Sequence, residues 1–120
     1  MPELPDIERY LHALRPRLLH RGITGVRVAA PFLVRTIDPP VTALTGRTVT
    51  GLRRLGKRIV IDAGDISAVL HLMIAGRLRW LPSGAAIPKR IGLAAIDFAS
   101  GTLVVTEAGT TRRASLHMAQ

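Results

Sequence analysis

Apolar residues recur at helical spacing in only one part of this chain, close to its start. The positions that would share one face of a helix are Ile7, Tyr10, Leu11, Leu14 and Leu18. Pro5 suits the first helical turn, Pro16 would weaken the last turn, and Gly22 is a stop signal. We therefore expect a single helix over residues 5–20.

The rest of the chain has the pattern of short strands separated by turn residues. Candidate strands lie at 22–28, 47–55, 57–63, 66–74, 77–81, 93–99 and 102–108. Ser100 and Gly101 form a hairpin signal, and Gly76 indicates a bulge or a close backbone approach. One helix followed by about six to eight strands predicts a mainly β domain with one N-terminal α-helix, folded as a two-sheet antiparallel β-sandwich or flattened barrel. Residues 111–120 fit no element and resemble the start of a connection.

Length and composition narrow the class of protein. A chain of 120 residues with 48% apolar residues is long enough for one domain with a packed core, and too apolar to be disordered. The absence of cysteine excludes disulfides and thiolate metal sites. No apolar run reaches the length of a membrane span, and the acidic start is unlike a secretory leader. We expect a cytoplasmic protein.

The charge of the chain points to a polyanionic partner. Seventeen basic residues face eight acidic ones, which gives a net charge of +9, and every basic residue except Lys57 and Lys89 is Arg. The planar guanidinium group binds two phosphate oxygens at once, so nucleic acid is the natural partner. An Arg-rich proteome is the alternative explanation. On charge alone, an RNA-binding β protein of ribosomal type stays possible.

The first residues carry a possible nucleophile. Once the initiator methionine is removed, Pro2 would be a free secondary amine, able to attack an aldehyde carbon and form an iminium ion. Its α-amino group titrates near neutrality, so a useful fraction would be unprotonated. Glu3 beside it could act as a general acid or base. The alternative is that Pro2 merely permits a turn before the helix.

Four stretches of the sequence resemble the formamidopyrimidine-DNA glycosylase and endonuclease VIII family. They are PELPDIE at 2–8, LGKRI at 55–59, HLMIAGRLR at 71–79 and TRRASLH at 111–117. The resemblance implies that residues 1–110 form the family's N-terminal catalytic domain. Residues 111–120 would then begin the connection to a helix-two-turn-helix and zinc-finger region that this sequence lacks. No cofactor is implied for this chain, because the family's zinc is structural and belongs to that region.

The resemblance also implies roles for individual residues. Pro2 matches the nucleophile that attacks C1′ of the damaged nucleotide, Glu3 the acid that protonates the deoxyribose ring oxygen, and Lys57 a lysine beside the lesion. The residues that match DNA contacts are the phosphate-binding His71, the intercalating Ile74, and Arg112 and Arg113 at the gap left by the flipped base. Without the family, Lys57 and the two arginines would be taken as surface charges and His71 as a packed strand histidine.

Some positions depart from the family pattern. Asp6 stands where the family usually has Glu, Ile74 replaces an intercalating methionine, and Ala114 replaces a phenylalanine that probes the opposite base. Isoleucine is apolar and can still act as a wedge between bases, but it is stiff. Leu4 favours the formamidopyrimidine branch over the endonuclease VIII branch, which usually has Gly there. The preferred lesion and opposite base are therefore expected to differ from those of a typical member.

The resemblance implies a DNA glycosylase and AP lyase of base excision repair that acts on oxidised or ring-opened purines. Its partner would be double-stranded DNA with damaged bases or abasic sites, in the cytoplasm of a bacterium and at its nucleoid. The alternative is a basic DNA-binding domain of the same fold that no longer performs chemistry. The isolated chain is expected to be weakly active or inactive, because the missing region supplies much of the family's grip on DNA.

Overall fold

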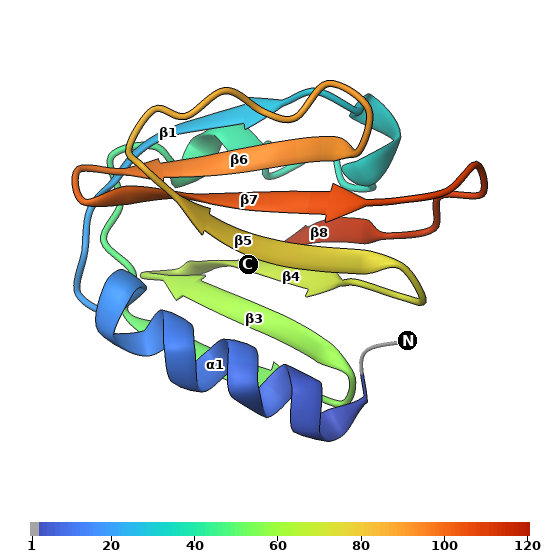
Figure 1. Cartoon of the computed structure of the whole chain (residues 1–120). Coiled ribbons are helices and arrows are strands. Elements are labelled where there is room, and N and C mark those ends of the chain that lie inside the picture. Colours follow the sequence, from blue (N-terminus) through green and yellow to red (C-terminus); the bar gives the residue numbers. More distant parts are fainter. Residues whose placement is uncertain (1–2) are drawn as a thin grey trace.

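The computed structural model describes residues 3–120, which form one α-helix and two four-stranded antiparallel sheets (Figure 1). The first sheet has the order β1 (Ile23–Val28), β6 (Gly92–Phe98), β7 (Gly101–Glu107) and β5 (Gly76–Leu81). The second has the order β2 (Gly51–Leu55), β3 (Arg58–Ala63), β4 (Ile66–His71) and β8 (Ser115–Ala119). Two short 3-10 helices, η1 (Pro31–Leu33) and η2 (Val41–Leu44), lie between β1 and β2 in the chain. The predicted mainly β sandwich with one N-terminal helix is confirmed; within residues 3–120 the two sheets stay separate and no barrel closes.

Helix α1 (Leu4–Leu18) packs against β2 and β3 and buries the apolar stripe that the sequence predicts. The helix ends two residues earlier than expected. Leu19 already has an extended backbone, and His20 takes a left-handed φ of 66°. Gly22 is therefore not the stop, and it instead forms an isolated bridge with Thr48.

The core lies between the sheets and under α1, and it is built almost entirely from aliphatic side chains. Strand β7 has a neighbour on each side, β6 and β5, and every one of its residues is buried. The β6–β7 hairpin forms where the sequence predicts it, with Phe98 paired to Gly101. Gly101 serves a packing purpose as well, because a Cβ there would lie 2.2 Å from the Trp80 ring.

Two connections cross between the sheets at the same end of the sandwich. The β4–β5 turn (residues 72–75) leads from the second sheet to the first, and the β7–β8 loop (residues 108–114) leads back. The strand register brings their ends together, since Gly76 lies opposite Glu107 and His71 lies opposite Ser115. This end of the sandwich therefore carries two neighbouring segments that are far apart in sequence.

The last residues are part of the sheet, contrary to the expectation that residues 111–120 form no element. Strand β8 pairs with β4 from Ser115 to Ala119, and Leu116 and Met118 reach the core. The sequence pattern does not reveal this strand because the segment is short and basic at its start.

Candidate functional site

The candidate residues gather at the end of the sandwich where the two connections cross. Arg58, the first residue of β3, lies opposite His71, the last residue of β4, so the β2–β3 hairpin is at this end too. Figure 1 shows the start of α1, this hairpin, the β4–β5 turn and the β7–β8 loop all toward the right-hand end of the sandwich. The antiparallel register thus brings together positions spread over the whole chain.

The start of α1 is joined to the β2–β3 hairpin by an ion pair. Lys57 Nζ lies 3.1 Å from Glu3 Oε2, and both side chains are partly exposed. The backbone N–H of Glu3 donates to Asp6 Oδ2 at 2.8 Å, so Asp6 caps the helix. The structure therefore brings two of the three predicted catalytic residues into contact. The third, Pro2, lies outside the described residues.

The hairpin tip that presents Lys57 is shaped by two neighbours. Gly56 has a φ of 60°, which a two-residue hairpin turn of this kind requires. Arg54 Nη1 donates to the carbonyl of Gly56 at 2.9 Å, and Arg54 Nε lies 3.1 Å from Glu8 Oε1 on α1. Arg54 thus ties the hairpin to the helix, a link that sequence reasoning missed because Glu8 is distant from Arg54 in sequence.

His71 lies on the same end, in a basic environment. Burial, followed by the positive charges of Arg58 and Lys57, lowers the pKa of His71 below its usual range. The free protein therefore favours the neutral imidazole near neutral pH. A neutral imidazole is able to take up a proton when a negative group approaches it.

The β4–β5 turn presents an apolar side chain to solvent. Ile74 is 58% exposed, and the preceding Met73 takes a φ of 60°, which is uncommon for a residue other than glycine. The turn is tight, since the N–H of Gly76 donates to the carbonyl of Leu72 at 3.0 Å. The predicted close backbone approach at Gly76 is confirmed, because a Cβ there would lie 2.2 Å from the Leu72 oxygen.

The β7–β8 loop carries the two predicted arginines in different environments. Arg112 is half-buried and hydrogen-bonds the carbonyl of Arg90, whereas Arg113 is exposed. The next residue, Ala114, is fully buried. Its side chain is therefore turned to the core, and this position offers nothing to a surface ligand.

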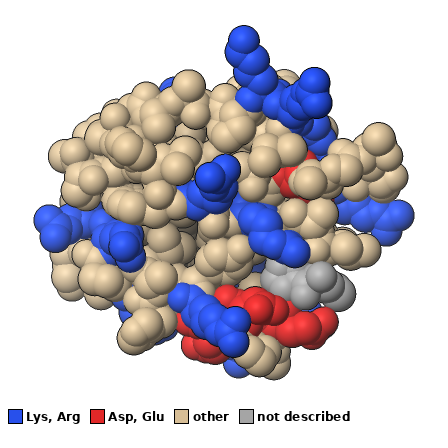
Figure 2. All heavy atoms as spheres, viewed as in Figure 1, with Lys and Arg blue, Asp and Glu red and all other residues tan. Residues whose placement is uncertain are grey.

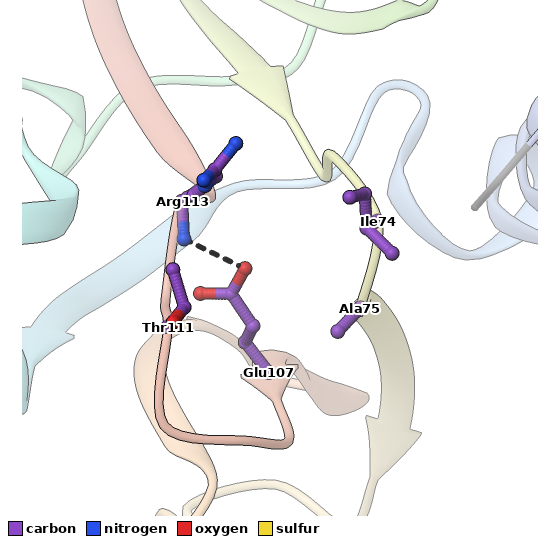
Figure 3. A pocket seen from close by; sticks show the side chains of 5 residues that line it. All are labelled: Ile74, Ala75, Glu107, Thr111 and Arg113. Carbon is purple, nitrogen blue, oxygen red and sulfur yellow. Dashed lines mark hydrogen bonds between the residues drawn. The ribbon is translucent and has the colours of Figure 1, made fainter.

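A pocket of about 240 Å³ separates the β4–β5 turn from the β7–β8 loop. Its lining residues are Ile74, Ala75, Glu107, Thr111 and Arg113 (Figure 3). Glu107 was not predicted as a site residue. Its sequence signal is one acidic residue ending an otherwise uncharged strand, TLVVTE.

Charge is unevenly distributed over this part of the molecule. Figure 2 shows basic side chains in separate clusters across a largely uncharged face, and most of the acidic ones gathered where α1 begins. The acidic residues of the first helical turns each have a basic partner: Glu3 with Lys57, Asp6 with Arg9, and Glu8 with Arg54. Ion pairs as exposed as these contribute at most about 1 kcal/mol each, so they matter here for placement more than for stability.

The described residues offer no metal site. Residues 3–120 contain no group of three or more His, Cys, Asp or Glu side chains that could hold a metal ion, and the chain has no cysteine. In the same residues, no helix is both long and apolar enough to cross a bilayer.

Comparison with known proteins points to one family. The family model for the formamidopyrimidine-DNA glycosylase N-terminal domain matches residues 1–114. The formamidopyrimidine-DNA glycosylase of Xanthomonas axonopodis pv. citri is 39% identical over 107 residues, covering 87% of this chain and 39% of the relative. That of Shewanella loihica is 30% identical over 104 residues, covering 87% of this chain and 38% of the relative.

A solved structure gives the same result for the fold. The complex of Lactococcus lactis Fpg with DNA containing an abasic site superposes with a TM-score of 0.86 and 25% identity, over 98% of this chain and 43% of that chain. The present chain thus spans well under half the length of these relatives. Because the family model covers nearly the whole chain, this chain belongs to the formamidopyrimidine-DNA glycosylase N-terminal domain family.

Proposed function

We propose that the chain is the catalytic N-terminal part of a DNA glycosylase and AP lyase of base excision repair, acting on oxidised or ring-opened purines in double-stranded DNA. The observation that carries the proposal is the contact between Glu3 and Lys57, 3.1 Å apart at the start of α1. These two residues are 54 positions apart in sequence. A surface lysine and a terminal glutamate have no structural need to meet, because such a pair adds little stability.

The proposed chemistry begins once Met1 is removed and the damaged nucleotide has left the stack, since C1′ is inaccessible inside a duplex. The nitrogen of Pro2 attacks C1′, and the base leaves with the electron pair of its bond to C1′. Glu3 takes the N–H proton of the resulting ammonium and passes it to the deoxyribose ring oxygen as the bond from C1′ to that oxygen breaks. The product is an iminium ion between Pro2 and the sugar. Loss of a proton from C2′ then expels the 3′ phosphate, which is the lyase step. Lys57 holds Glu3 in place and lies beside the sugar-phosphate backbone.

The same end of the sandwich would meet the DNA. The neutral His71 takes up a proton against a phosphate, and Ile74 wedges between bases at the flipped nucleotide. Arg112 and Arg113 would lie at the gap that the flipped base leaves. The exposed Ile74 supports this role, because a wedge must project from a rigid turn to enter a base stack.

Borohydride trapping on a duplex with an abasic site tests the proposal. The chain without Met1 should form a covalent adduct, and the chain with Met1 attached should form none, since the proline nitrogen is then an amide. Glu3→Gln should still be trapped on a preformed abasic site yet lose base removal, because the acid acts before the aldehyde exists. Glu8→Gln is the matched control, since Glu8 is another exposed acid of α1 that also pairs with a basic residue.

Two results would overturn the proposal. Trapping at the wild-type level with Met1 attached would exclude Pro2 as the nucleophile and direct attention to Lys57. Tight binding to abasic DNA without any adduct from the processed chain would favour the alternative, a basic DNA-binding domain that performs no chemistry.

A further inference from the structure

Glu107 lies where the two crossing connections meet. It is the last residue of β7, and in the sheet it lies opposite Gly76, which ends the β4–β5 turn. Its side chain reaches the other connection, where Glu107 Oε2 accepts the backbone N–H groups of Arg113 at 2.9 Å and Ala114 at 3.1 Å. One residue therefore lies beside the end of the turn in the sheet and is bound to the loop through its carboxylate (Figure 3).

The environment of this carboxylate is unusual. Glu107 is 1% exposed, and none of the basic residues among 3–120 forms an ion pair with it. Its second oxygen, Oε1, is buried and has no hydrogen-bond partner within the described part of the chain. Burying a carboxylate that is only half satisfied is costly. An apolar residue, as at Leu103, Val104 and Val105 of the same strand, would avoid that cost. The two hydrogen bonds to the loop therefore offset the cost of burying the carboxylate.

The loop has few other bonds: Arg112 donates to the carbonyl of Arg90, and Arg35 Nη2 donates to the carbonyl of Ala114 at 3.5 Å. Residues 108–111 are exposed, Arg112 is half-buried, and Ala114 is the first fully buried residue after Glu107. The carboxylate closes a loop of six to seven residues and sets where Arg113 stands relative to the pocket. On the opposite wall the turn carries Ile74, and its distance from β7 is set by the pairing of Gly76 with Glu107.

We propose that Glu107 is a positioning residue that holds Arg113 and Ile74 at a set separation across the pocket. Both side chains then enter the DNA together at the gap left by a flipped nucleotide. The inference rests on the proposed function for the identity of the DNA partner. Without the carboxylate the fold persists, but the loop moves relative to the turn and the two side chains no longer act as a pair.

The test measures binding of the full chain to two duplexes of the same sequence, one with a tetrahydrofuran abasic-site analogue and one undamaged. The ratio of the two affinities reports recognition of the gap, and the affinity for undamaged DNA reports the basic surface alone. Glu107→Ala removes both bonds, and Glu107→Gln keeps a weaker neutral acceptor. The ratio should fall about tenfold in Glu107→Ala, a change of about 1.4 kcal/mol in the preference for the gap, and by less in Glu107→Gln.

Asp97→Asn is the matched control. Asp97 is also a partly buried carboxylate in the first sheet, bound to Arg27 and Thr102, but it lies near the opposite end of β7. It should lower the melting temperature without changing the affinity ratio. Residue-level amide exchange adds a readout on the free protein: the N–H groups of Arg113 and Ala114 should exchange at least about tenfold faster in Glu107→Ala, and stay protected in Asp97→Asn.

The possible outcomes distinguish failure of the proposed function from failure of the positioning role of Glu107. A wild-type chain that binds both duplexes equally would overturn the proposed function and the inference with it. A wild-type preference for the abasic analogue that Glu107→Ala and Glu107→Gln retain in full would overturn only the positioning role. If Glu107→Ala does not fold, Glu107→Gln and Glu107→Asp, whose shorter side chain cannot reach both N–H groups, decide the question by the same ratio.

Discussion

Replacing Gly76 by alanine should destabilise the chain and displace the turn that carries Ile74. The new methyl carbon would lie 2.2 Å from the oxygen of Leu72, 2.8 Å from its Cα and 2.9 Å from its carbonyl carbon. All three are backbone atoms, so no change of rotamer relieves the contact. The turn has to open, and the 3.0 Å hydrogen bond from Gly76 N–H to the Leu72 carbonyl is lost.

The size of the effect follows from these contacts. Forcing a methyl group into a packed site costs about 1–3 kcal/mol, and losing one backbone hydrogen bond costs about 1 kcal/mol more. The free energy of unfolding should therefore fall by about 2–4 kcal/mol. At roughly 4 °C per kcal/mol for a chain of this size, the melting temperature should fall by about 8–16 °C. Thermal and urea unfolding of the variant would measure both quantities.

Gly22→Ala is the matched control. A methyl group added at Gly22 would meet no heavy atom within 4 Å, and the backbone there has no left-handed φ. This replacement should therefore change the free energy of unfolding by less than about 0.5 kcal/mol. Equal melting temperatures for Gly76→Ala and Gly22→Ala would refute the reasoning, because the turn would then be shown to accept the methyl group without opening.

Three further predictions concern the pH dependence of stability, the salt dependence of DNA binding, and the replacement of Ile74. Because burial and nearby cations lower the pKa of His71, the unfolded chain binds more protons than the folded chain between that lowered pKa and the ordinary value of 6.5. Stability should be complete above this window and fall as the pH decreases through it, and urea titrations should show a shallower fall for His71→Gln. Binding to duplex DNA should weaken steeply with salt, since guanidinium contacts to phosphate release counterions; affinity that stays flat between low and high salt would contradict the electrostatic argument. Ile74→Ala should cost less than about 0.5 kcal/mol of stability, because the side chain is largely exposed, yet lower the preference for abasic over undamaged duplex in the same binding assay; an unchanged preference would show that Ile74 is no wedge.

The sequence is most informative where structure depends on local pattern. The stripe from Ile7 to Leu18 is set by helical periodicity, and the β6–β7 hairpin by the turn residues between two apolar runs. The end of α1 is not predicted because the left-handed residue is His20, and a histidine gives no such signal in sequence. Strand β8 escapes prediction for a different reason. It is defined by its pairing with β4, a contact between segments some 50 residues apart, which no local pattern contains.

The residues of the candidate site also differ in whether a local sequence pattern can identify them. The motifs identified Lys57, His71 and Ile74, and the register of β3 and β4 explains why these lie at one end. Glu107 could not be identified in this way. Its part in the structure depends on the pairing of β5 with β7 and on the path of the following loop, both of which are non-local. An acid at the end of a buried strand signals only that something nearby must satisfy it.

The two connections that frame the pocket are held by different means, and this decides how each can vary. The β4–β5 turn is fixed by backbone contacts at Gly76, so a longer or bulkier residue there moves the whole turn and Ile74 with it. The β7–β8 loop is fixed only near its end, by the Glu107 carboxylate on the N–H groups of Arg113 and Ala114 and by the hydrogen bond from Arg112 to the carbonyl of Arg90. Residues 108–111 are exposed, so this segment can change in length and composition as long as the hydrogen bonds near the end of the loop are kept. The shape of the pocket can therefore be altered most readily through the loop, while the turn supplies a rigid wall on its other side.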